Sequence, residues 1–308
     1  MRALVISGGG SKGAFAGGVA EYLISIKKRK YELLLGTSTG SLLIPHLSLG
    51  KIDKIRNIYT NVHQRWIFNL NPFVVKRKGN RQYIGINFGV PLLQFLKRRR
   101  TFGESKNLRK NIRKNFLESE FHEMKSKLKD VVVTVSNLTK NCVEYKSMRD
   151  CNYEDFCDWI WISCNYIPFM SITKKNNYEY ADGGFGCMVP IREAIRRGAT
   201  TIDAIILESE IKEYNKILGN NPFSLMVNLY GFMIDQVSVN DVIKGKLEAS
   251  NKGVTLNLYY TPSKLTENSL IFNKNLMKEW WQLGFKSAKE KFSHKELNEL
   301  RNENLDKK

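Results

Sequence analysis

The sequence YELLLGTSTG at residues 31–40 places a run of apolar residues directly before a glycine-bounded turn. The run Tyr31–Leu35 is typical of a buried strand, and a helical pattern follows the turn as far as Gly50. Gly36-Thr37-Ser38-Thr39-Gly40 matches G-x-S-x-G, in which a serine lies on a cramped turn between a strand and a helix. The two glycines remove side chains that would collide with those elements, so we predict that Ser38 is a nucleophile.

A glycine-rich loop precedes this unit. The strand predicted at Ala3–Ser7 leads into Gly8-Gly9-Gly10-Ser11-Lys12-Gly13, and a helical pattern then runs from Gly13 to Lys28. Consecutive glycines let backbone N–H groups converge on one point, and the helix N-terminus adds positive potential there. The loop is therefore suited to hold an oxyanion on its backbone amides.

The same loop also matches Gly8-x-Gly10-x-x-Gly13, the fingerprint of dinucleotide-binding proteins. That interpretation requires an acidic residue at the end of the second strand, whereas Glu32 opens that strand and Gly36 closes it. A dinucleotide-binding enzyme therefore stays the weaker alternative. A Walker A loop is excluded because Lys12 precedes the final glycine and no Ser or Thr follows the pair.

A serine nucleophile needs a base, and Asp182 is our candidate. It follows the strand predicted at Tyr178–Ala181, and Gly183-Gly184 lets the chain turn sharply and present the carboxylate at the carboxyl edge of a sheet. An aspartate that only starts a turn is the alternative interpretation. His294 has the chain order of a Ser–Asp–His triad but lies in a charged tail segment. The other histidines are interpreted as surface or packing residues: His46, His63 and His122.

Short apolar runs alternate with helical patterns along the chain, which predicts an α/β fold with a mainly parallel sheet covered by helices. The simplest division is a catalytic domain over residues 1–210 and a largely helical C-terminal extension over 211–308, packed on that domain. Trp280 and Trp281 are interpreted as core residues of the last helix, with membrane docking as the alternative. Further strands are predicted at 131–135, 143–147, 202–207 and 254–260, and further helices at 191–197 and 275–308.

The chain is strongly basic, with 49 Lys and Arg against 30 Asp and Glu and a net charge of +19. Residues 76–130 hold 16 basic and 5 acidic residues, so an excess of 11 positive charges lies in this predicted insertion. Its densest run is Lys97-Arg98-Arg99-Arg100. Such charge attracts polyanions. No nucleic-acid-binding module accompanies it, so we expect contact with an anionic membrane surface, with nucleic-acid binding or a plain solvated face as alternatives.

The cysteines and the apolar runs indicate the redox state of the thiols and the cellular location of the protein. Five cysteines, with no CxxC pair and no histidines at zinc spacing, predict reduced thiols rather than disulfides or a zinc site. The apolar run at the N-terminus stops after Ile6, which is too short for a signal peptide, and no stretch of about 18 apolar residues predicts a spanning helix. We expect a cytoplasmic protein with peripheral membrane contact that needs neither a metal nor a cofactor.

Three ordered motifs together carry a family resemblance. GGGSKG follows the first predicted strand, GTSTG follows the second, and DGG stands about 140 residues later, as in the patatin-like phospholipase family. The match is extended by Val135–Thr139, by Ile167-Pro168 before the DGG and by Val189-Pro190-Ile191 after it. The resemblance covers residues 1 to about 210.

The resemblance implies a three-layer α/β/α sandwich that hydrolyses acyl esters of lipids with a Ser–Asp dyad and no histidine. Ser38 would then be the nucleophile and Asp182 the base, and the amides of Gly8, Gly9 and Gly10 would form the oxyanion hole. Lys12 matches the basic position of the family's loop and is expected to brace it. The remaining motif glycines would brace the turns: Gly13, Gly36, Gly40, Gly183 and Gly184.

The sequence departs from the family pattern in two places. Cys164-Asn165-Tyr166 stands where members carry small residues with a serine, which changes the expected shape of the pocket. Pro45 lies in the helix after Ser38, where it removes a backbone hydrogen bond and should kink the helix. Neither departure falls on Ser38 or Asp182.

Overall fold

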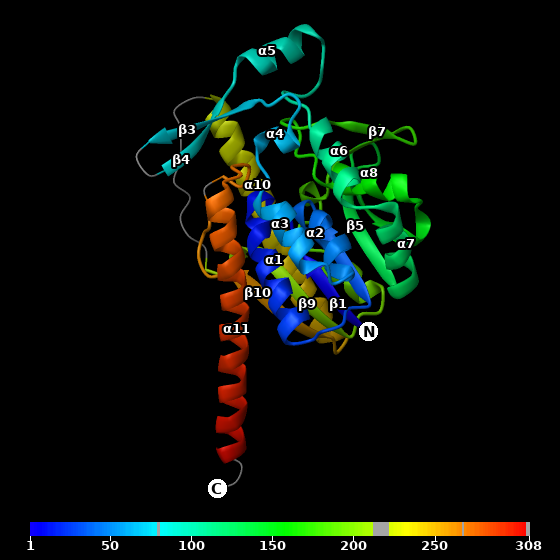
Figure 1. Cartoon of the computed structure of the whole chain (residues 1–308), viewed down its shortest axis with the longest axis vertical. Coiled ribbons are helices and arrows are strands. Elements are labelled where there is room, and N and C mark those ends of the chain that lie inside the picture. Colours follow the sequence, from blue (N-terminus) through cyan, green and yellow to red (C-terminus); the bar gives the residue numbers. More distant parts are fainter. Residues whose placement is uncertain (79–80, 212–221, 267, 306–308) are drawn as a thin grey trace.

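The computed structural model describes residues 1–78, 81–211, 222–266 and 268–305, with an eight-stranded sheet through the middle of the molecule (Figure 1). Its strands in chain order are β1 Arg2–Ile6, β2 Leu33–Thr37, β5 Asp130–Asn137, β6 Cys142–Ser147, β7 Thr173–Lys175, β8 Tyr178–Asp182, β9 Thr201–Ser209 and β10 Thr255–Thr261. Their order across the sheet is β10-β9-β1-β2-β5-β8-β7, and β6 also pairs with β5.

Most of the sheet is parallel. Strands β10, β9, β1, β2 and β5 all run in one direction. Strands β6 and β8 run antiparallel to β5, and β7 runs antiparallel to β8. Because parallel neighbours need crossover connections, helices must cover both faces of this part of the sheet.

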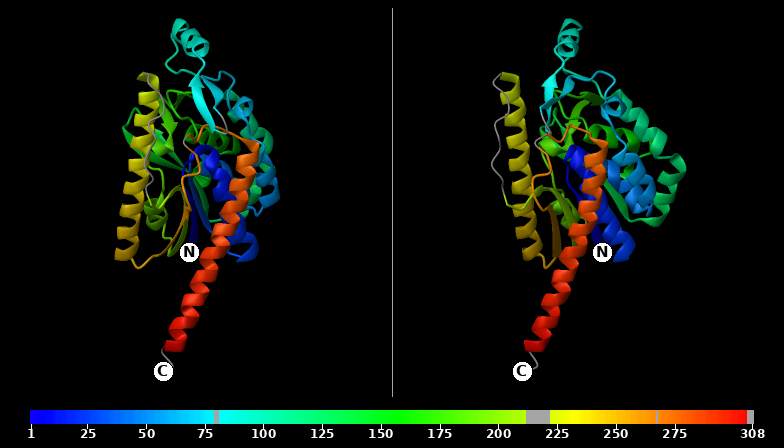
Figure 2. Two further views of the ribbon diagram at one scale, coloured as in Figure 1. Left: turned by 90° about the vertical axis from the view of Figure 1, so that its left-hand side faces the viewer. Right: turned by 60° about the vertical axis from the view of Figure 1, so that its left-hand side comes forward.

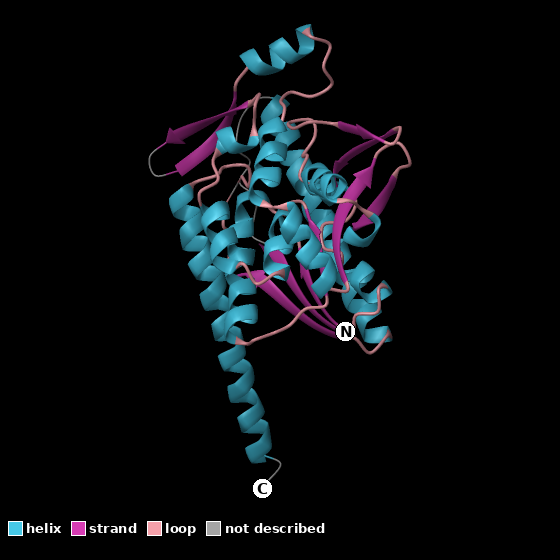
Figure 3. Ribbon diagram, turned by 45° about the vertical axis from the view of Figure 1, so that its right-hand side comes forward, coloured by secondary structure: helices cyan, strands magenta, loops and turns pink. Residues whose placement is uncertain are grey.

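Helices form a layer on each face of the sheet, as the views in Figures 2 and 3 show. One layer contributes to the core around Phe15 and Phe156, and it contains α1 Gly13–Glu21, α2 Thr39–Ser48, α3 Ile52–Thr60, α6 Lys106–Asn115, α7 Glu118–Lys127, α8 Tyr153–Ser163 and α11 Lys274–Leu305. The opposite layer consists of α9 Ile191–Arg196 and α10 Pro222–Asn251. The predicted three-layer α/β/α sandwich with a mainly parallel sheet is confirmed.

Alternation along the buried strands divides the core between the two layers. On β1, Leu4 and Ile6 face the layer of α1 and α2, whereas Ala3 and Val5 face the layer of α9 and α10. All four side chains are fully buried. This two-sided burial explains why the strands are continuous apolar runs in the sequence.

Most predicted elements lie within two residues of the observed ones. The main shift concerns β2, which begins and ends two residues later than the predicted Tyr31–Leu35. Gly36 and Thr37 belong to the strand because both of its neighbours continue alongside them: Ile6 of β1 pairs with Gly36, and Thr134 of β5 pairs with Thr37. The strand therefore ends immediately before Ser38.

The basic segment 76–130 is only partly an insertion. It contains the end of the hairpin β3 Phe73–Lys78 and β4 Arg81–Ile86, followed by α5 Gly89–Leu96 and then α6 and α7. The last two helices bury Phe116 and Phe121 in the main core. Arg109 of α6 binds the Asp158 carboxylate of α8 through two hydrogen bonds of 2.8 and 2.7 Å. Part of the positive charge is thus used inside the fold.

The C-terminal residues complete the sheet and one helical layer. Strand β10 pairs with β9, and α11 packs along α1. The ring of Trp281 occupies the space left by Gly17, where an added Cβ would lie 2.1 Å from the ring. Trp280 and Trp281 are both buried, so their interpretation as core residues is confirmed and membrane docking through them was wrong. Within the described residues, no helix has the combination of length and apolar character that crossing a membrane requires.

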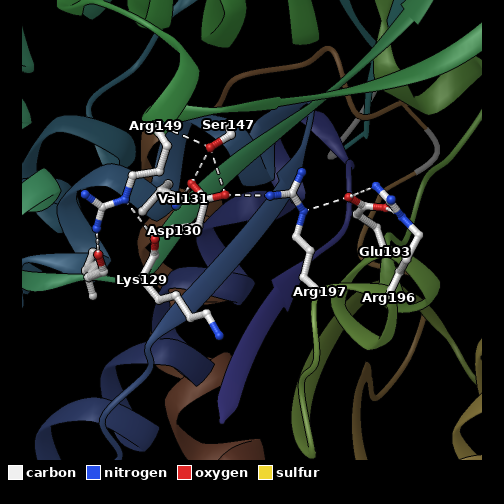
Figure 4. A network of polar contacts seen from close by, with 9 residues as sticks. Lys129, Asp130, Val131, Ser147, Arg149, Glu193, Arg196 and Arg197 are labelled. Atoms are coloured by element: carbon white, nitrogen blue, oxygen red, sulfur yellow. Dashed lines mark hydrogen bonds and ion pairs between the residues drawn. The ribbon is translucent and has the colours of Figure 1, made fainter.

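A polar network ties the amino-terminal end of β5 to α9 and β6 (Figure 4). The Asp130 carboxylate accepts hydrogen bonds from Ser147 Oγ at 2.7 and 2.8 Å and from Arg197 Nη1 at 2.5 Å. Arg197 Nε also donates to Glu193 Oε1 at 2.6 Å. Burial raises the pKa of Asp130, and the Ser147 hydroxyl and the Arg197 guanidinium oppose this shift. The Arg197 guanidinium therefore pairs with two buried carboxylates near the amino-terminal end of β5, at the end of the strand away from Ser38.

We predict that Arg197→Ala lowers the free energy of unfolding by about 2 kcal/mol, because it leaves Asp130 and Glu193 buried without their shared cation. Denaturant unfolding measures this loss. Arg192→Ala is a suitable control, since Arg192 is exposed and pairs with Glu248 on the surface. Equal stability of the two variants would show that the network contributes nothing beyond a surface ion pair.

Candidate active site

Ser38 lies on a strained turn between β2 and α2. Its backbone has φ 51° and ψ −119°, values that a side-chain-bearing residue rarely adopts. The turn is tight because an added Cβ at Gly36 would lie 2.5 Å from the Gly40 carbonyl carbon, and one at Gly40 would lie 2.3 Å from the Ile6 oxygen. The two motif glycines are therefore needed for close approach, and the turn projects the serine side chain beyond the end of the strand.

The register of β5 brings Asp182 to this turn. Strand β6 pairs with residues 132–137 along one edge of β5. Strands β2 and β8 share the other edge, because β2 ends with Thr37 beside Thr134 and β8 ends with Asp182 beside Val135. The two strands run toward each other and meet end to end. The sequence argument placed Asp182 at the carboxyl edge of a parallel sheet, but the carboxylate reaches that edge on an antiparallel strand.

The two side chains form a direct hydrogen bond. Ser38 Oγ donates to Asp182 Oδ2 at 2.6 Å, and the Gly184 N–H donates to Asp182 Oδ1 at 2.8 Å. Asp182 is buried, and burial raises the pKa of this carboxyl to about 7, although the bonds from Ser38 and Gly184 oppose the shift. The carboxylate thus combines contact with the hydroxyl and a proton affinity suited to neutral pH.

The histidines are placed elsewhere, as far as their side chains are described. His46 Nε2 lies 3.1 Å from the carbonyl oxygen of Asn115, inside α2 and away from the serine turn. His122 is exposed and lies near Glu118 on α7. His63 packs beside Trp66. The backbone of His294 belongs to α11, and its side chain lies outside the described residues.

Two of the three predicted donors of the glycine loop lie at the wall of the cavity that contains Ser38. The Gly8 N–H donates to the carbonyl of Met188 at 3.3 Å. Gly9 and Gly10 line the cavity next to Ser38, and their N–H groups donate to no other described residue. Both amides are therefore available to a ligand in the cavity.

Contacts from three other segments fix the shape of this loop. Gly10 has φ +54°, and its carbonyl accepts hydrogen bonds from Thr39 Oγ1 at 2.9 Å and from Tyr59 Oη at 2.5 Å. The Ser11 N–H donates to the carbonyl of Ser269 at 2.8 Å. An added Cβ at Gly13 would lie 2.4 Å from Tyr59 Oη, so this glycine lets the tyrosine approach. The loop is thus held by residues from α2, from α3 and from the segment between β10 and α11, which we call the C-terminal segment.

Lys12 is buried and forms an ion pair with Glu208, near the end of β9. Its ammonium group thus links the glycine loop to the neighbouring strand. This geometry does not support the alternative of a dinucleotide-binding site. Strand β2 ends at Thr37, and Glu32 lies before the strand begins, so no acidic residue stands where a ribose would need one.

The structure adds supporting residues that the motifs did not reveal. The Ser163 hydroxyl accepts a hydrogen bond of 2.9 Å from the Ser38 N–H and donates to the carbonyl of Thr134 at 2.7 Å. Met188 fills the space left by two motif glycines, since its sulfur lies 2.5 Å from an added Cβ at Gly8 and 3.2 Å from one at Gly184. These contacts join residues far apart in the sequence, so no local pattern signals them.

The segment that departs from the family pattern lines the site. Cys164 Sγ donates to the carbonyl of Ser38 at 3.1 Å, and the Asn165 carbonyl accepts the Asp182 N–H at 2.9 Å. The Tyr166 ring stacks on Phe185 at 5.4 Å between centroids. Cys164 and Asn165 thus hold the backbone at Ser38 and Asp182. Cys164 and Tyr166 also form part of the cavity wall.

A cavity of about 1510 Å³ opens from Ser38 and Asp182. Its wall is mainly aliphatic and aromatic, and it is built by α2, α3, α6, α10 and the C-terminal segment. Representative lining residues are Leu42, Ile55, Phe68, Phe116, Phe169 and Phe272. Among the described residues, no group of three His, Cys, Asp or Glu side chains is arranged to bind a metal ion. The site thus combines the half-buried Ser38 hydroxyl and the buried Asp182 carboxylate with a large, mainly apolar cavity.

Comparison with known proteins identifies the family. The model of the patatin-like phospholipase family matches residues 4–195, so the chain belongs to that family, and the resemblance seen in the three motifs is confirmed. Among solved structures, the fold is similar to VipD from Legionella pneumophila, with a TM-score of 0.50 and 11% identity. The similarity covers 94% of this chain and 66% of VipD. A search of curated proteins found no match.

We predict that Asp182 titrates near pH 7 in the folded protein, because burial disfavours its charged form. A difference titration between the folded wild type and Asp182→Asn should show one additional proton released around this pH. Asp53 is exposed, so a parallel titration with Asp53→Asn controls for the method. A difference curve centred near pH 4 would contradict the proposed environment of the carboxyl.

Proposed function

We propose that this protein is a lipid acyl hydrolase of the phospholipase A type, which cleaves carboxylic ester bonds through Ser38 and Asp182. The observation that carries the proposal is the hydrogen bond of 2.6 Å between Ser38 Oγ and Asp182 Oδ2 at the wall of a large apolar cavity. Membership of the patatin-like phospholipase family supports an ester of a lipid as the substrate. We further propose that residues 1–210 form the catalytic domain and that the C-terminal extension, residues 211–308, packs on it.

In the first half of the reaction, Ser38 Oγ attacks the carbonyl carbon of the ester while Asp182 Oδ2 accepts the hydroxyl proton. The oxygen of the resulting tetrahedral intermediate carries a negative charge. The free N–H groups of Gly9 and Gly10 are the donors best placed to stabilise it, whereas the Gly8 N–H is already bound to Met188. Gly8 supports the site in another way, because the absence of a side chain at this position leaves space for Met188.

Asp182 then returns the proton to the departing alcohol, and the acyl group remains on Ser38. In the second half, water attacks the acyl-enzyme while Asp182 again accepts the proton. The second tetrahedral intermediate then breaks its bond to Ser38 Oγ and releases the carboxylic acid, and Asp182 returns the proton to Ser38 Oγ. A carboxyl with a pKa of about 7 is suited to both steps, because it takes and gives a proton at comparable cost near neutral pH. Burial of Asp182 therefore provides the proton affinity that a histidine supplies in a Ser–His–Asp triad.

The cavity supports a substrate with long acyl chains. Apolar side chains line it along α3, and α6 adds Leu108 and Ile112; transferring a methylene group from water to such a surface is favourable by about 0.8 kcal/mol. The reacting ester would lie at Ser38, where polar groups gather, and the acyl chain would extend between Ile55 and Phe116. A soluble short-chain ester should therefore react with weaker binding, without any change in the chemistry.

We predict that Ser38→Ala abolishes ester hydrolysis and that Asp182→Asn lowers turnover by about 10⁴-fold, the loss seen when the carboxylate of a catalytic triad is replaced. Steady-state kinetics on a soluble short-chain ester measure both effects. Circular dichroism and denaturant unfolding should show that each variant folds.

His294→Ala is the matched control, because His294 is the only histidine with the chain order of a triad. Its turnover should equal that of the wild type. Near-normal turnover in Asp182→Asn, together with a large loss in His294→Ala, would replace the dyad by a triad.

We also propose that the enzyme binds the surface of an anionic membrane through the exposed part of its basic segment. The run Lys97–Arg100 is exposed, whereas Arg109 and Arg113 of the same segment bind Asp158 within the fold. Arg100 contacts Glu179, so Lys97, Arg98 and Arg99 are the residues of the run best placed for lipid headgroups. Each basic residue near an anionic surface contributes about 1 kcal/mol.

We predict that the double reversal Arg98→Glu and Arg99→Glu weakens binding to anionic vesicles at least about 30-fold, from about 1 kcal/mol for each cation lost. Vesicle sedimentation at rising anionic lipid content and rising salt measures this effect. Turnover of a soluble ester should stay within a few-fold of the wild type.

The reversal Lys286→Glu and Lys289→Glu, on the exposed side of α11, makes the same change in net charge and should have little effect. Equal weakening by both pairs would show that only net charge matters. Binding to nucleic acid in a filter assay, without dependence on lipid, would favour the nucleic-acid alternative.

A further inference from the structure

Helix α5 shows the reverse of the burial expected for a helix in water. Gln94, its polar residue, is 2% exposed. Four large apolar side chains are instead more than half exposed: Phe88 at 75%, Leu92 at 59%, Phe95 at 78% and Leu96 at 71%. These four residues are spaced i, i+4, i+7 and i+8, so they form one continuous stripe along the helix. Leu92, Phe95 and Leu96 face solvent.

The helix stands at one end of the molecule, beyond the hairpin of β3 and β4 (Figure 1). Phe88, directly before the helix, lines the cavity that contains Ser38. The exposed run Lys97–Arg100 follows directly after the helix. An apolar stripe, a basic run and the wall of the cavity therefore meet in one short segment of the chain.

We propose that α5 is an interfacial anchor, which inserts its apolar stripe into an anionic lipid bilayer and sets the cavity against the bilayer surface. The proposal rests on the proposed function and extends it by naming the element that enters the lipid. Phe88, Leu92, Phe95 and Leu96 enter the boundary between headgroups and acyl chains, and the cations of Lys97, Arg98 and Arg99 lie among the headgroups.

The dimensions of the helix suit this position. Eight residues give a helix of about 12 Å, which is far shorter than the roughly 30 Å hydrocarbon core of a bilayer. A helix with one apolar face and adjacent Lys and Arg side chains lies in the plane of the interface, where its apolar face is covered and its cations reach phosphate groups. A protein partner would cover the stripe equally well, but the four consecutive cations beside it favour an anionic lipid surface.

The placement has a consequence for substrate entry. Because Phe88 belongs to both the exposed stripe and the cavity wall, an inserted α5 brings part of that wall to the lipid surface. A lipid leaving the bilayer would move along apolar side chains toward Ser38 without full exposure to water, which lowers the cost of extracting its acyl chains.

The test is sedimentation of the full chain with vesicles of phosphatidylcholine containing increasing phosphatidylserine, in a Ser38→Ala background so that the lipid stays intact. The double variant Leu92→Ser and Phe95→Ser should bind at least about 10-fold more weakly, since burying one such side chain changes an equilibrium by about that factor. The control is Ile243→Ser with Leu247→Ser, which removes two side chains of α10 that are 51% and 61% exposed. It should bind like the parent.

Other outcomes would overturn the assignment. Unchanged binding in the α5 variant, equal weakening in both variants, or no binding by the parent would each exclude α5 as an anchor. A concentration-dependent dimer, measured without lipid and abolished by the α5 substitutions, would assign the stripe to a second copy of the chain.

Hydrolysis of a soluble short-chain ester separates this inference from the proposed function. With Ser38 restored, the α5 variant should keep turnover within a few-fold of the wild type, because Leu92 and Phe95 do not line the cavity. If the wild type fails to hydrolyse the ester, the proposed function fails, while sedimentation still decides the role of α5. If it hydrolyses the ester but α5 is dispensable for vesicle binding, only the anchor fails.

Discussion

Two strands that meet end to end on one edge of β5 determine the geometry of the site. Thr37 ends β2 beside Thr134, and Asp182 ends β8 beside Val135, so adjacent residues of β5 fix the positions of both side chains. Hydrogen bonds between strands fix the relative positions of paired residues, whereas loops are more mobile and more variable. The pair is therefore positioned by rigid structure, and the turn at Ser38 and the turn at Gly183-Gly184 need only project the side chains toward each other.

The surrounding contacts make the site dependent on the whole fold. Met188 packs against two motif glycines, Ser163 supports the backbone at Ser38, and Ser269 holds the glycine loop from the C-terminal segment. Asp241 of α10 in turn accepts hydrogen bonds from the N–H groups of Met188 and Val189. Residues outside the matched region 4–195 thus complete a site whose principal side chains lie within it.

The sequence predicted the parts of the site that short-range geometry demands. A strand, a glycine-bounded serine and a glycine loop can be recognised locally, because backbone sterics limit which residues fit. Asp182 was predicted as the base of Ser38 from its place at a strand end before Gly183-Gly184, and the family resemblance then implied the Ser–Asp dyad. The antiparallel direction of β8, the hydrogen bond from Ser38 N–H to Ser163 and the occupied amide of Gly8 depend on contacts between segments that lie far apart in the sequence, which no local pattern contains. The exposed stripe on α5 could not be predicted, because apolar spacing alone does not show which face is buried.

Burial of Asp182 also affects the energetics of folding. With a pKa of about 7, the folded protein binds a proton on this carboxyl between about pH 4 and pH 7, where the unfolded chain has released it. Folding is then coupled to proton uptake, so this group makes the folded state less stable as pH rises, by up to about 1.4 kcal/mol for each pH unit in that window. The loss is complete above pH 7, where the carboxyl is ionised in the folded protein as well. The ionised form, which acts as the base in the proposed mechanism, is thus the one that folding favours least.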